Sequence, residues 1–331
     1  MINNKVELHL HLDGSLNLMW SFNKAKELSV IDKEMSFEEY YRIMFSRNVG
    51  HSAETIKKFD ILCDLLQRKQ DIFEASYNLV KHLEQIGVMY AEIRFAPQQH
   101  LKQGLSKLEV LKNVIDGANK ACLEGNIKVG VISCLMHKGD SADYNYKENL
   151  ETIEASKQLL HAGVVGIDLA GYENNCEYKD YLNVIKIVKE YNIPLTMHAG
   201  EMGIASHIID AIDMGADRIG HGVNCVNDEK ILERVVKRQI PLEVCVSSNV
   251  KPDYNYATHP IRKLIEAGAY ITINSDNMIF AKTDINNEFN QLHMLGISDE
   301  QLKQFTLNAI NASFADDKTK DELRRRLNET N

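Results

Sequence analysis

Two histidines separated by one residue lie near the N-terminus of this 331-residue chain. His9 and His11 fall at the end of a β-rich run, and because side chains alternate along a strand they point to the same face. Two neighbouring imidazoles at a strand end suit a Zn²⁺ ion. Taken alone, the motif is also compatible with a pair of hydrogen-bonded interior histidines, which is the alternative.

Further groups of this kind follow other β-rich runs. His198 and Glu201 belong to the segment MHAGE, and His221 stands between two glycines in RIGHG. Asp276 belongs to NSDN, where by itself it could form an Asx turn or cap a helix. Together, three histidines and an aspartate can hold one metal ion, leaving another His and a Glu for proton transfer. The set predicts a metal-assisted hydrolase, because bound Zn²⁺ lowers the pKa of water toward neutrality.

Eight β-rich runs carry these groups and alternate with helical patterns, which predicts βαβ units with parallel pairing. The runs cover residues 5–10, 89–95, 128–135, 164–169, 194–197, 217–220, 241–245 and 270–274. The helical patterns between them cover residues 106–124, 146–161, 178–191, 227–238 and 260–267. Eight units favour an α/β fold of the (β/α)₈ TIM-barrel type, in which catalytic groups gather at the carboxyl ends of the strands. An open, doubly wound sheet is the alternative.

Extra helical segments follow the first run and the last. The insertion from about residue 15 to residue 87 contains helical patterns at 37–45, 53–66 and 71–86, more than one crossover needs. In a barrel such an insertion lies over the active-site mouth, so we expect a helical lid or a segment for packing or dimer contact. Patterns at 286–295 and 299–311 precede a charged tail, 316–331, expected to be a solvated helix. With no repeat or linker visible, we expect a single barrel domain over residues 1–331.

Composition and charge favour a small-molecule ligand. The chain has 38 Lys and Arg against 47 Asp and Glu, a formal charge of −9, and no basic cluster. Because phosphate contacts supply most non-specific affinity for nucleic acid, we expect no nucleic-acid partner. No run of 18 apolar residues occurs, so we expect no membrane partner either.

The N-terminus and the cysteines bear on the compartment. No basic stretch followed by an apolar core occurs at the N-terminus, so no signal peptide is expected. None of the six cysteines forms a C-x-x-C pair, and we expect scattered reduced thiols in a cytoplasmic protein. They are Cys63, Cys122, Cys134, Cys176, Cys225 and Cys245.

The motifs, in this order and spacing, resemble those of the adenosine deaminase family of the amidohydrolase superfamily. The matching segments are VELHLHLDGSL from Val6, YAEIRFAPQQH from Tyr90, GIDLAGYE from Gly166, MHAGE from Met197, RIGHG from Arg218, LEVCVSSN from Leu242 and NSDN from Asn274. The resemblance covers essentially the whole chain. It implies zinc-dependent hydrolytic deamination of adenosine or 2′-deoxyadenosine to inosine or 2′-deoxyinosine and ammonia. The alternatives are deamination of adenine or another 6-aminopurine derivative, or a catalytically weak purine-binding relative.

The resemblance also implies roles for the metal-binding and catalytic residues. One Zn²⁺ per chain would be bound by His9, His11, His198 and Asp276. Glu201 would protonate the purine ring nitrogen next to the reacting carbon, which requires a carboxylic acid kept protonated near neutral pH. His221 would orient the attacking water or hydroxide, and Asp276 would assist in proton transfer.

Four residues would contact the substrate on the same grounds. They are His11, Asp13 for a ribose hydroxyl, the backbone N–H of Gly171 for a ring nitrogen, and Asn277. The last departs from the family, which usually has an aspartate there that bonds the imidazole nitrogen of the purine. An amide supplies N–H donors without needing protonation, so we expect Asn277 to keep this contact at some cost in rate. The alternative is that Asn277 only caps the next helix.

A buried ion pair is expected one layer below the metal. Glu7 shares the parity of His9 and His11, and Arg94 shares a face with Glu92 on the second run. Because a lone buried carboxylate is costly, we expect Glu7 to pair with Arg94.

Overall fold

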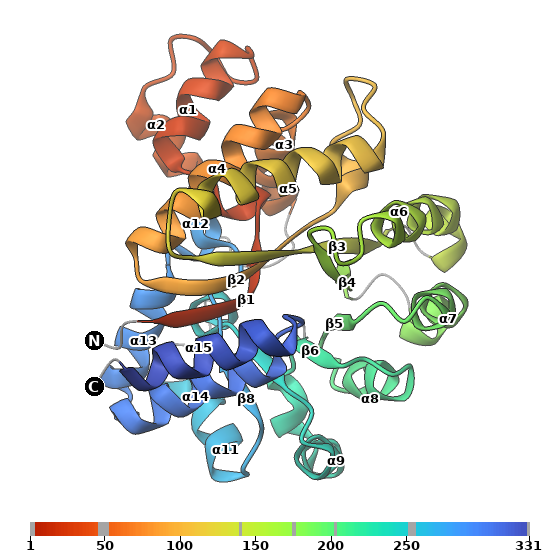
Figure 1. Cartoon of the computed structure of the whole chain (residues 1–331), viewed down its shortest axis with the longest axis vertical. Coiled ribbons are helices and arrows are strands. Elements are labelled where there is room, and N and C mark those ends of the chain that lie inside the picture. The colour runs from red at the N-terminus through yellow and green to blue at the C-terminus, as the bar shows by residue number, and fades with distance from the viewer. Residues whose placement is uncertain are drawn as a thin grey trace.

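A computed structural model of the chain describes residues 4–45, 53–138, 141–173, 177–201, 204–250 and 256–329, and its eight strands form one parallel sheet (Figure 1). Each strand pairs with the next along the chain. The strands are β1 (Lys5–His11), β2 (Val88–Phe95), β3 (Lys128–His137), β4 (Val164–Gly171), β5 (Leu195–Ala199), β6 (Arg218–His221), β7 (Leu242–Val244) and β8 (Ile271–Ile273). All eight predicted strands are present, with ends within two residues of the expected positions.

The sheet closes where the chain leaves β8. Leu10 and Asp276 form a parallel bridge, in which the N–H of His11 donates to the carbonyl of Asp276 at 3.0 Å. The N–H of Asp276 donates in turn to the carbonyl of His9 at 2.8 Å. The predicted (β/α)₈ TIM barrel is therefore confirmed, and the open sheet is excluded. The closing contact joins three of the predicted metal ligands, His9, His11 and Asp276, through their backbones.

Helices cover the outside of the sheet, as the alternating pattern predicted. They are α5 (Lys107–Leu123), α6 (Tyr146–Gln158), α7 (Leu182–Glu190), α8 (Ser206–Asp213), α9 (Glu229–Arg238) and α11 (Ile261–Glu266). Helix α8 was not predicted, and the start of the helix expected at 178–191 is a 3₁₀ turn, η4 (Tyr178–Tyr181). Two one-turn helices, α10 (Val246–Asn249) and α12 (Met278–Ala281), follow β7 and β8.

Helix α5 shows how local sequence sets these elements. Ser106 and Glu109 form a capping box, in which the Ser106 hydroxyl accepts from the Glu109 N–H at 3.2 Å and the Glu109 carboxylate accepts from the Ser106 N–H at 3.0 Å. Val110 and Val114 then recur one turn apart and are completely buried. The cap fixes where the helix begins, and the apolar spacing fixes which face lies on the barrel.

The long first connection contains four helices. They are α1 (Leu18–Glu27), α2 (Phe37–Met44), α3 (Ala53–Asp64) and α4 (Lys69–Gln85). Figure 1 shows α1, α2 and α3 grouped at one end of the molecule, beyond α4 and α5. Helix α3 reaches the carboxyl rim of the barrel, where the ring of Phe59 lies 4.6 Å from that of Phe280 in α12. Residues 46–52 of the predicted insertion lie outside the described part of the chain.

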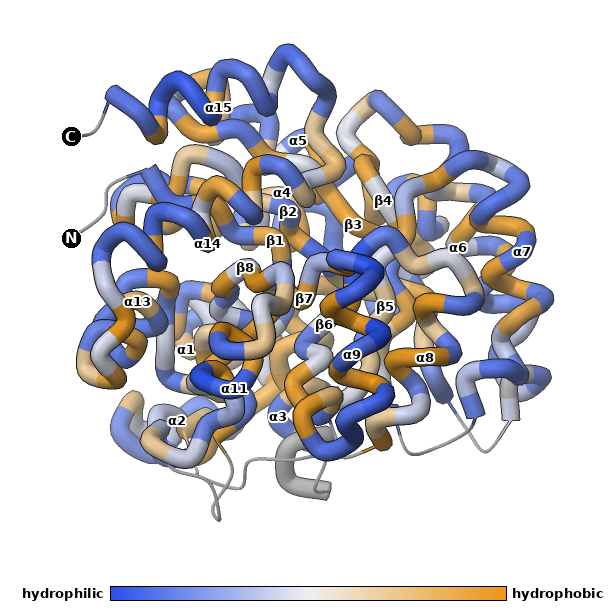
Figure 2. Tube along the Cα trace, turned by 90° about the horizontal axis from the view of Figure 1, so that it is seen from below, coloured by the Kyte–Doolittle hydropathy of each residue, from blue (hydrophilic) through white to orange (hydrophobic). Residues whose placement is uncertain are grey.

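Three helices follow α12: α13 (Ile285–Met294), α14 (Asp299–Ala312) and α15 (Asp317–Glu329). The expectation of a solvated terminal helix is wrong for one face of α15. Leu323 and Leu327 are buried in a cluster with Val6 and Leu8 of β1. Figure 2 shows this helix as mostly hydrophilic with isolated hydrophobic positions. Two leucines one turn apart suffice to dock an otherwise charged helix against the barrel.

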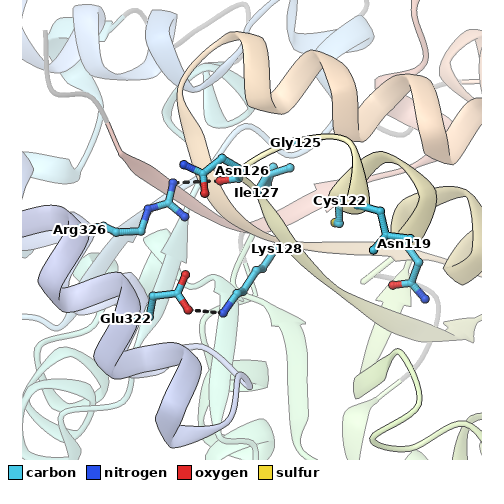
Figure 3. Close-up of a pocket in the computed structure, with 9 residues that line it drawn as sticks. Asn119, Cys122, Gly125, Asn126, Ile127, Lys128, Glu322 and Arg326 are labelled. Atoms are coloured by element: carbon cyan, nitrogen blue, oxygen red, sulfur yellow. Dashed lines mark hydrogen bonds and ion pairs between the residues drawn. The ribbon is translucent and has the colours of Figure 1, made fainter.

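A surface pocket lies where β3 begins, at the end of the barrel opposite to the strand ends that carry the predicted site (Figure 3). Its charged groups are already paired: Lys128 contacts Glu322 at 2.5 Å, and Arg326 donates to the carbonyl of Asn126 at 3.0 Å. These contacts tie α15 to the start of β3, so this end of the barrel serves stability. In the described part of the chain, no helix has the length and apolar character needed to span a membrane.

Inside the barrel, two arginines and three acids form a buried network. Arg94 contacts Asp168 at 3.0 Å and Glu243 at 2.8 Å. Arg218 contacts Glu243 and Glu92, each at 2.6 Å. All five side chains are completely buried or nearly so. We call these five residues the lower layer.

The predicted pair between Glu7 and Arg94 is wrong, because Arg94 faces acids on β4 and β7 instead. Glu7 does lie inside, where its Oε1 accepts the N–H of Ser275 at 3.0 Å. Burial raises the pKa of Glu7 well above its usual value, so the neutral acid avoids the cost of an unpaired buried charge.

Candidate active site

Two histidines of β1 and the aspartate after β8 come together at the carboxyl rim. The Nε2 atoms of His9 and His11 lie 3.6 and 3.4 Å from Oδ1 of Asp276. One donor atom from each of the three residues lies within 4.8 Å of the others. The neighbouring strand ends β1 and β8 thus place three of the predicted metal ligands around one point.

His198 and His221 complete the cluster from the ends of β5 and β6. Their rings lie 4.6 and 4.8 Å from that of His9, and potential ligand atoms of the three residues again lie within 4.8 Å of one another. His221 and Asp276 both have left-handed backbones, with φ of 61° and 59°. Such conformations are strained for residues other than Gly, and they persist where the surrounding structure requires them.

Hydrogen bonds orient the imidazoles. Nδ1 of His9 lies 2.8 Å from Glu243 and Nδ1 of His198 lies 2.9 Å from Asp168. With the Nδ1 atoms occupied, the Nε2 atoms are left for the centre of the cluster, the usual arrangement behind a metal ligand. The lower layer therefore also positions the rim.

The residues after β7 support the other two members. The side-chain amide of Asn249 lies 3.3 Å from Nδ1 of His221. The hydroxyl of Ser248 donates to Oδ2 of Asp276 at 2.5 Å, which leaves Oδ1 facing the histidines. The short helix α10 thus holds both residues from one side.

Burial and charge set the protonation of the cluster. Burial lowers the pKa of His9 and, more strongly, that of His11, and it lowers that of His221 to about 4. Burial disfavours ionisation of Asp276, but the surrounding imidazoles hold its pKa well below the usual range. At His198 burial is outweighed by the Asp168 carboxylate, which raises the pKa of that imidazole. For the other three histidines and Asp276, the favoured forms, neutral imidazole and ionised carboxylate, are those that bind a metal ion.

The residues present fit a zinc ion. Nε2 of His9 is buried and makes no hydrogen bond, although it lies among four other potential ligands. An unsatisfied buried polar atom is costly, and a metal ion would satisfy it. Imidazole nitrogens and a carboxylate oxygen are also the donors that Zn²⁺ takes.

Glu201 lies beside the cluster, with its Oε2 3.7 Å from Nε2 of His221. Glu173, which the sequence reasoning missed, fixes this segment. Its Oε1 accepts the N–H of Gly200 at 2.6 Å, and its Oε2 accepts the N–H of Glu201 at 3.0 Å. The signal that could have found it is an acid two residues after the Gly that ends β4.

Asp13 follows β1 and is buried at the rim, where burial raises its pKa to about 6. The N–H of Gly14 donates to its Oδ1 at 2.9 Å. Gly171 ends β4 at the same rim with φ of 117°, and a Cβ there would lie 2.6 Å from the carbonyl oxygen of His137.

Asn277 lies next to the cluster and donates from Nδ2 to Oδ1 of Asp276 at 2.7 Å. It precedes α12, but its side chain accepts no capping hydrogen bond from that helix. Asn277 therefore occupies the N-cap position of α12, but its side chain does not cap the helix. Its Oδ1 is buried without a hydrogen-bond partner.

The residues that support the histidines were the larger omission of the sequence reasoning. Asp168 and Glu243 are single acids inside apolar strands, GIDLAG and PLEVC, and a charge at such a position is a usable signal. Ser248 and Asn249 carry no comparable signal, because Ser and Asn are common in any loop.

Comparison with known proteins agrees with the geometry. The family described as Adenosine deaminase matches residues 4–330. The chain belongs to the adenosine deaminase family. It is 34% identical over 329 residues to an adenosine deaminase of Clostridium perfringens strain SM101, which covers 97% of this chain and 96% of that protein. Members of this family are hydrolytic aminohydrolases, and this chain is an enzyme of that class.

Two solved structures share the fold. An adenine deaminase from Arthrobacter aurescens has a TM-score of 0.88 and 26% identity, covering 99% of this chain and 98% of that one. An amidohydrolase from Burkholderia ambifaria, solved with bound Zn, has a TM-score of 0.88 and 22% identity, covering 99% of this chain and 90% of that one. Proteins similar to this chain thus include an adenosine deaminase and an adenine deaminase.

Proposed function

We propose that this adenosine deaminase family member hydrolyses the 6-amino group of adenosine and 2′-deoxyadenosine, releasing inosine or 2′-deoxyinosine and ammonia. The observation that carries the proposal is the convergence of three histidines and Asp276 around the unsatisfied Nε2 of His9. Residues 1–331 act as one barrel domain in this proposal.

His9, His11, His198 and Asp276 would hold one Zn²⁺ per chain. When bound, this ion supplies a water of lowered pKa. The protein's part is to keep the imidazoles of His9 and His11 neutral by burial, and to fix the tautomers of His9 and His198 through Glu243 and Asp168.

Three residues would move or hold protons around the reacting carbon, C6. Glu201 donates a proton to the neighbouring ring nitrogen, which makes C6 electrophilic. His221, oriented by Asn249, aligns the attacking water through Nε2, and Asp276 accepts a proton from that water. The water oxygen bonds to C6, and the proton taken up by Asp276 passes to the amine. The C6–amine bond then breaks and releases ammonia, while the hydroxyl on C6 becomes a carbonyl and its proton returns to the Glu201 carboxylate.

The substrate would be held by His11, Asp13, Gly171 and Asn277. Asp13 accepts a hydrogen bond from a ribose hydroxyl, the N–H of Gly171 donates to a ring nitrogen, and His11 lines the purine side. Asn277 donates to the imidazole nitrogen of the purine, since an amide has a second N–H beside the one given to Asp276.

A second candidate activity is the deamination of adenine or another 6-aminopurine derivative. Two observations favour it: Asn277 departs from the aspartate usual in the family, and the adenine deaminase structure is 26% identical over nearly the whole chain. Adenosine remains the better proposal, because Asp13 supplies an acceptor for ribose and the curated relative at 34% identity is an adenosine deaminase.

The deciding experiment offers adenosine, 2′-deoxyadenosine, adenine, AMP and a 5′-modified adenosine to the purified full-length chain. Turnover is followed by the ultraviolet change and by ammonia release, and bound metal is measured in the same preparation. We expect the highest kcat/KM for the two nucleosides. A preference for adenine would replace the main proposal with the second candidate. Purine binding without turnover of any compound by the metal-loaded protein would leave only a binding function.

A further inference from the structure

A second group of metal-binding side chains lies at the rim beside Asp13. Cys63 comes from α3 and His100 from the segment after η2 (Pro97–Gln99). One potential ligand atom from each of the three residues lies within 4.8 Å of the others. All three are buried, and the proposed reaction uses neither Cys63 nor His100.

The sulfur of Cys63 lies between two oxygen acceptors. Its Sγ is 3.8 Å from Oδ2 of Asp13 and 3.4 Å from Oε1 of Gln99. Zinc bonds to sulfur and oxygen at tetrahedral angles place the two ligand atoms about 3.6 Å apart. The observed separations lie on either side of that value, so an ion could bind with little rearrangement.

The imidazole of His100 is the second observation that points to a ligand. The side chain is 1% exposed, and neither ring nitrogen makes a hydrogen bond of normal geometry, although the carbonyls of Cys63 and Leu66 lie near the ring. Burial lowers its pKa to about 4, so the ring is neutral and one nitrogen keeps its lone pair. A histidine with one N–H toward a backbone carbonyl and the other nitrogen toward a metal ion is a common ligand arrangement.

We propose that Asp13, Cys63 and His100, with Oε1 of Gln99 as fourth ligand, form a second zinc site that is distinct from the histidine cluster. Thiolate and imidazole ligands select Zn²⁺ over Mg²⁺ or Ca²⁺. On binding, the sulfur–hydrogen bond of Cys63 breaks, the proton passes to solvent and the sulfur bonds to the ion. Because burial raises the pKa of this thiol, zinc affinity at the site increases with pH.

Occupation of this site would join three elements that are separate in sequence. The ligands come from the segment after β1, from α3 and from the segment after β2. The ion would therefore fasten α3 to the barrel rim. A further effect rests on the proposed function: Asp13 bound to the ion no longer accepts from the ribose, so excess zinc raises the KM for adenosine.

Cobalt provides a direct test, because the histidine cluster contains no sulfur ligand and cannot give a thiolate-to-cobalt charge-transfer band. Co²⁺ is titrated into the purified full-length chain, with metal content measured after desalting. We expect about two ions per chain and a near-ultraviolet band that appears with the second equivalent. A wild-type chain that binds about one ion and shows no band would overturn the proposal.

Variants assign the band to the site. Cys63→Ser should lose the band and the second equivalent and keep the first, with Cys63→Ala as a second variant if the first folds poorly. His100→Asn should lower the affinity for the second Co²⁺ ion at least tenfold. Cys225→Ser is the matched control, because Cys225 is also a buried thiol but belongs to no metal-binding group among the described residues. A band that persists in both Cys63 variants would refute the assignment.

Inhibition is measured separately. Excess Zn²⁺ should raise the KM for adenosine in the wild type but not in Cys63→Ser. If the band and the second equivalent are present and no nucleoside is turned over, the second site stands and the proposed function fails. If turnover is normal and the band is absent, the proposed function stands and the second site fails.

Discussion

Two layers of buried polar groups inside the barrel differ in how their charges are compensated. In the lower layer, each of the five charged side chains forms at least one ion pair, and Arg94 and Arg218 form two each. In the rim layer, the five residues His9, His11, His198, His221 and Asp276, a single carboxylate faces four imidazoles, and Nε2 of His9 makes no hydrogen bond.

The difference separates stability from function. In a layer where every charge is paired, no polar atom is free to bind a ligand. A buried polar atom without a partner, in contrast, lowers stability unless a ligand binds to it. Two acids connect the layers, because Glu243 and Asp168 bind the arginines below and the Nδ1 atoms of His9 and His198 above. Variants in the rim should therefore lower the rate, and variants confined to the lower layer should lower the stability.

The largest expected effect tests the rim. Glu201→Gln removes the proposed proton donor and keeps the shape of the side chain, so we expect kcat to fall about 10²–10⁴-fold with little change in the unfolding midpoint. Substrate binding, measured by calorimetry with adenosine, should be retained. Glu229→Gln, an exposed position at the start of α9, is the control and should behave as wild type. A Glu201→Gln rate near wild type would remove Glu201 from the mechanism.

The next effect tests the lower layer. Arg218→Met removes the ion-pair partner of Glu92 and of Oε1 of Glu243, and both carboxylates are completely buried. We therefore expect the free energy of unfolding to fall by about 3–5 kcal/mol. Urea unfolding measures the loss, and kcat of the folded fraction should stay within a few-fold of wild type. Arg234→Met breaks an exposed pair with Asp213 and should cost no more than about 1 kcal/mol. A similar loss in both variants would show that the lower layer has no special role in stability.

The same distinction explains what the sequence could predict. The rim residues are visible because His and Asp recur at the ends of strands, and the strands are visible from their β-rich composition. The ion-pair partners of Arg94 could not be predicted from composition or from residue types at strand ends. They depend on which interior positions of β4 and β7 reach the guanidinium across the barrel, and strand parity gives only the inward direction.

Elements held by few residues were also hard to predict. Helix α15 has a strongly charged sequence, and only Leu323 and Leu327 dock it. The role of α10 rests on a serine and an asparagine whose partners, Asp276 and His221, lie on other strands. Cys176, one of the expected reduced thiols, lies outside the described residues.

The smallest expected effect concerns Asn277, at the edge of the rim layer. The contact of Nδ2 with Oδ1 of Asp276 fixes the amide orientation, because a flipped amide would turn its oxygen toward the carboxylate. The second N–H then remains for the purine. Asn277→Ala should lower kcat/KM for adenosine about fivefold to tenfold, which corresponds to one hydrogen bond of about 1–1.4 kcal/mol.

Asn277→Asp separates this contact from a purely structural role. A carboxyl group next to Asp276 takes up a proton, because two neighbouring carboxylates do not both ionise readily, and the protonated acid can again donate to the purine. We therefore expect kcat/KM of Asn277→Asp to equal or exceed that of the wild type while Asn277→Ala falls. Steady-state kinetics with adenosine and adenine measure both. If neither substitution changes kcat/KM for the better substrate, Asn277 makes no contact with the purine, and its unpaired Oδ1 belongs with the structural groups rather than with the rim.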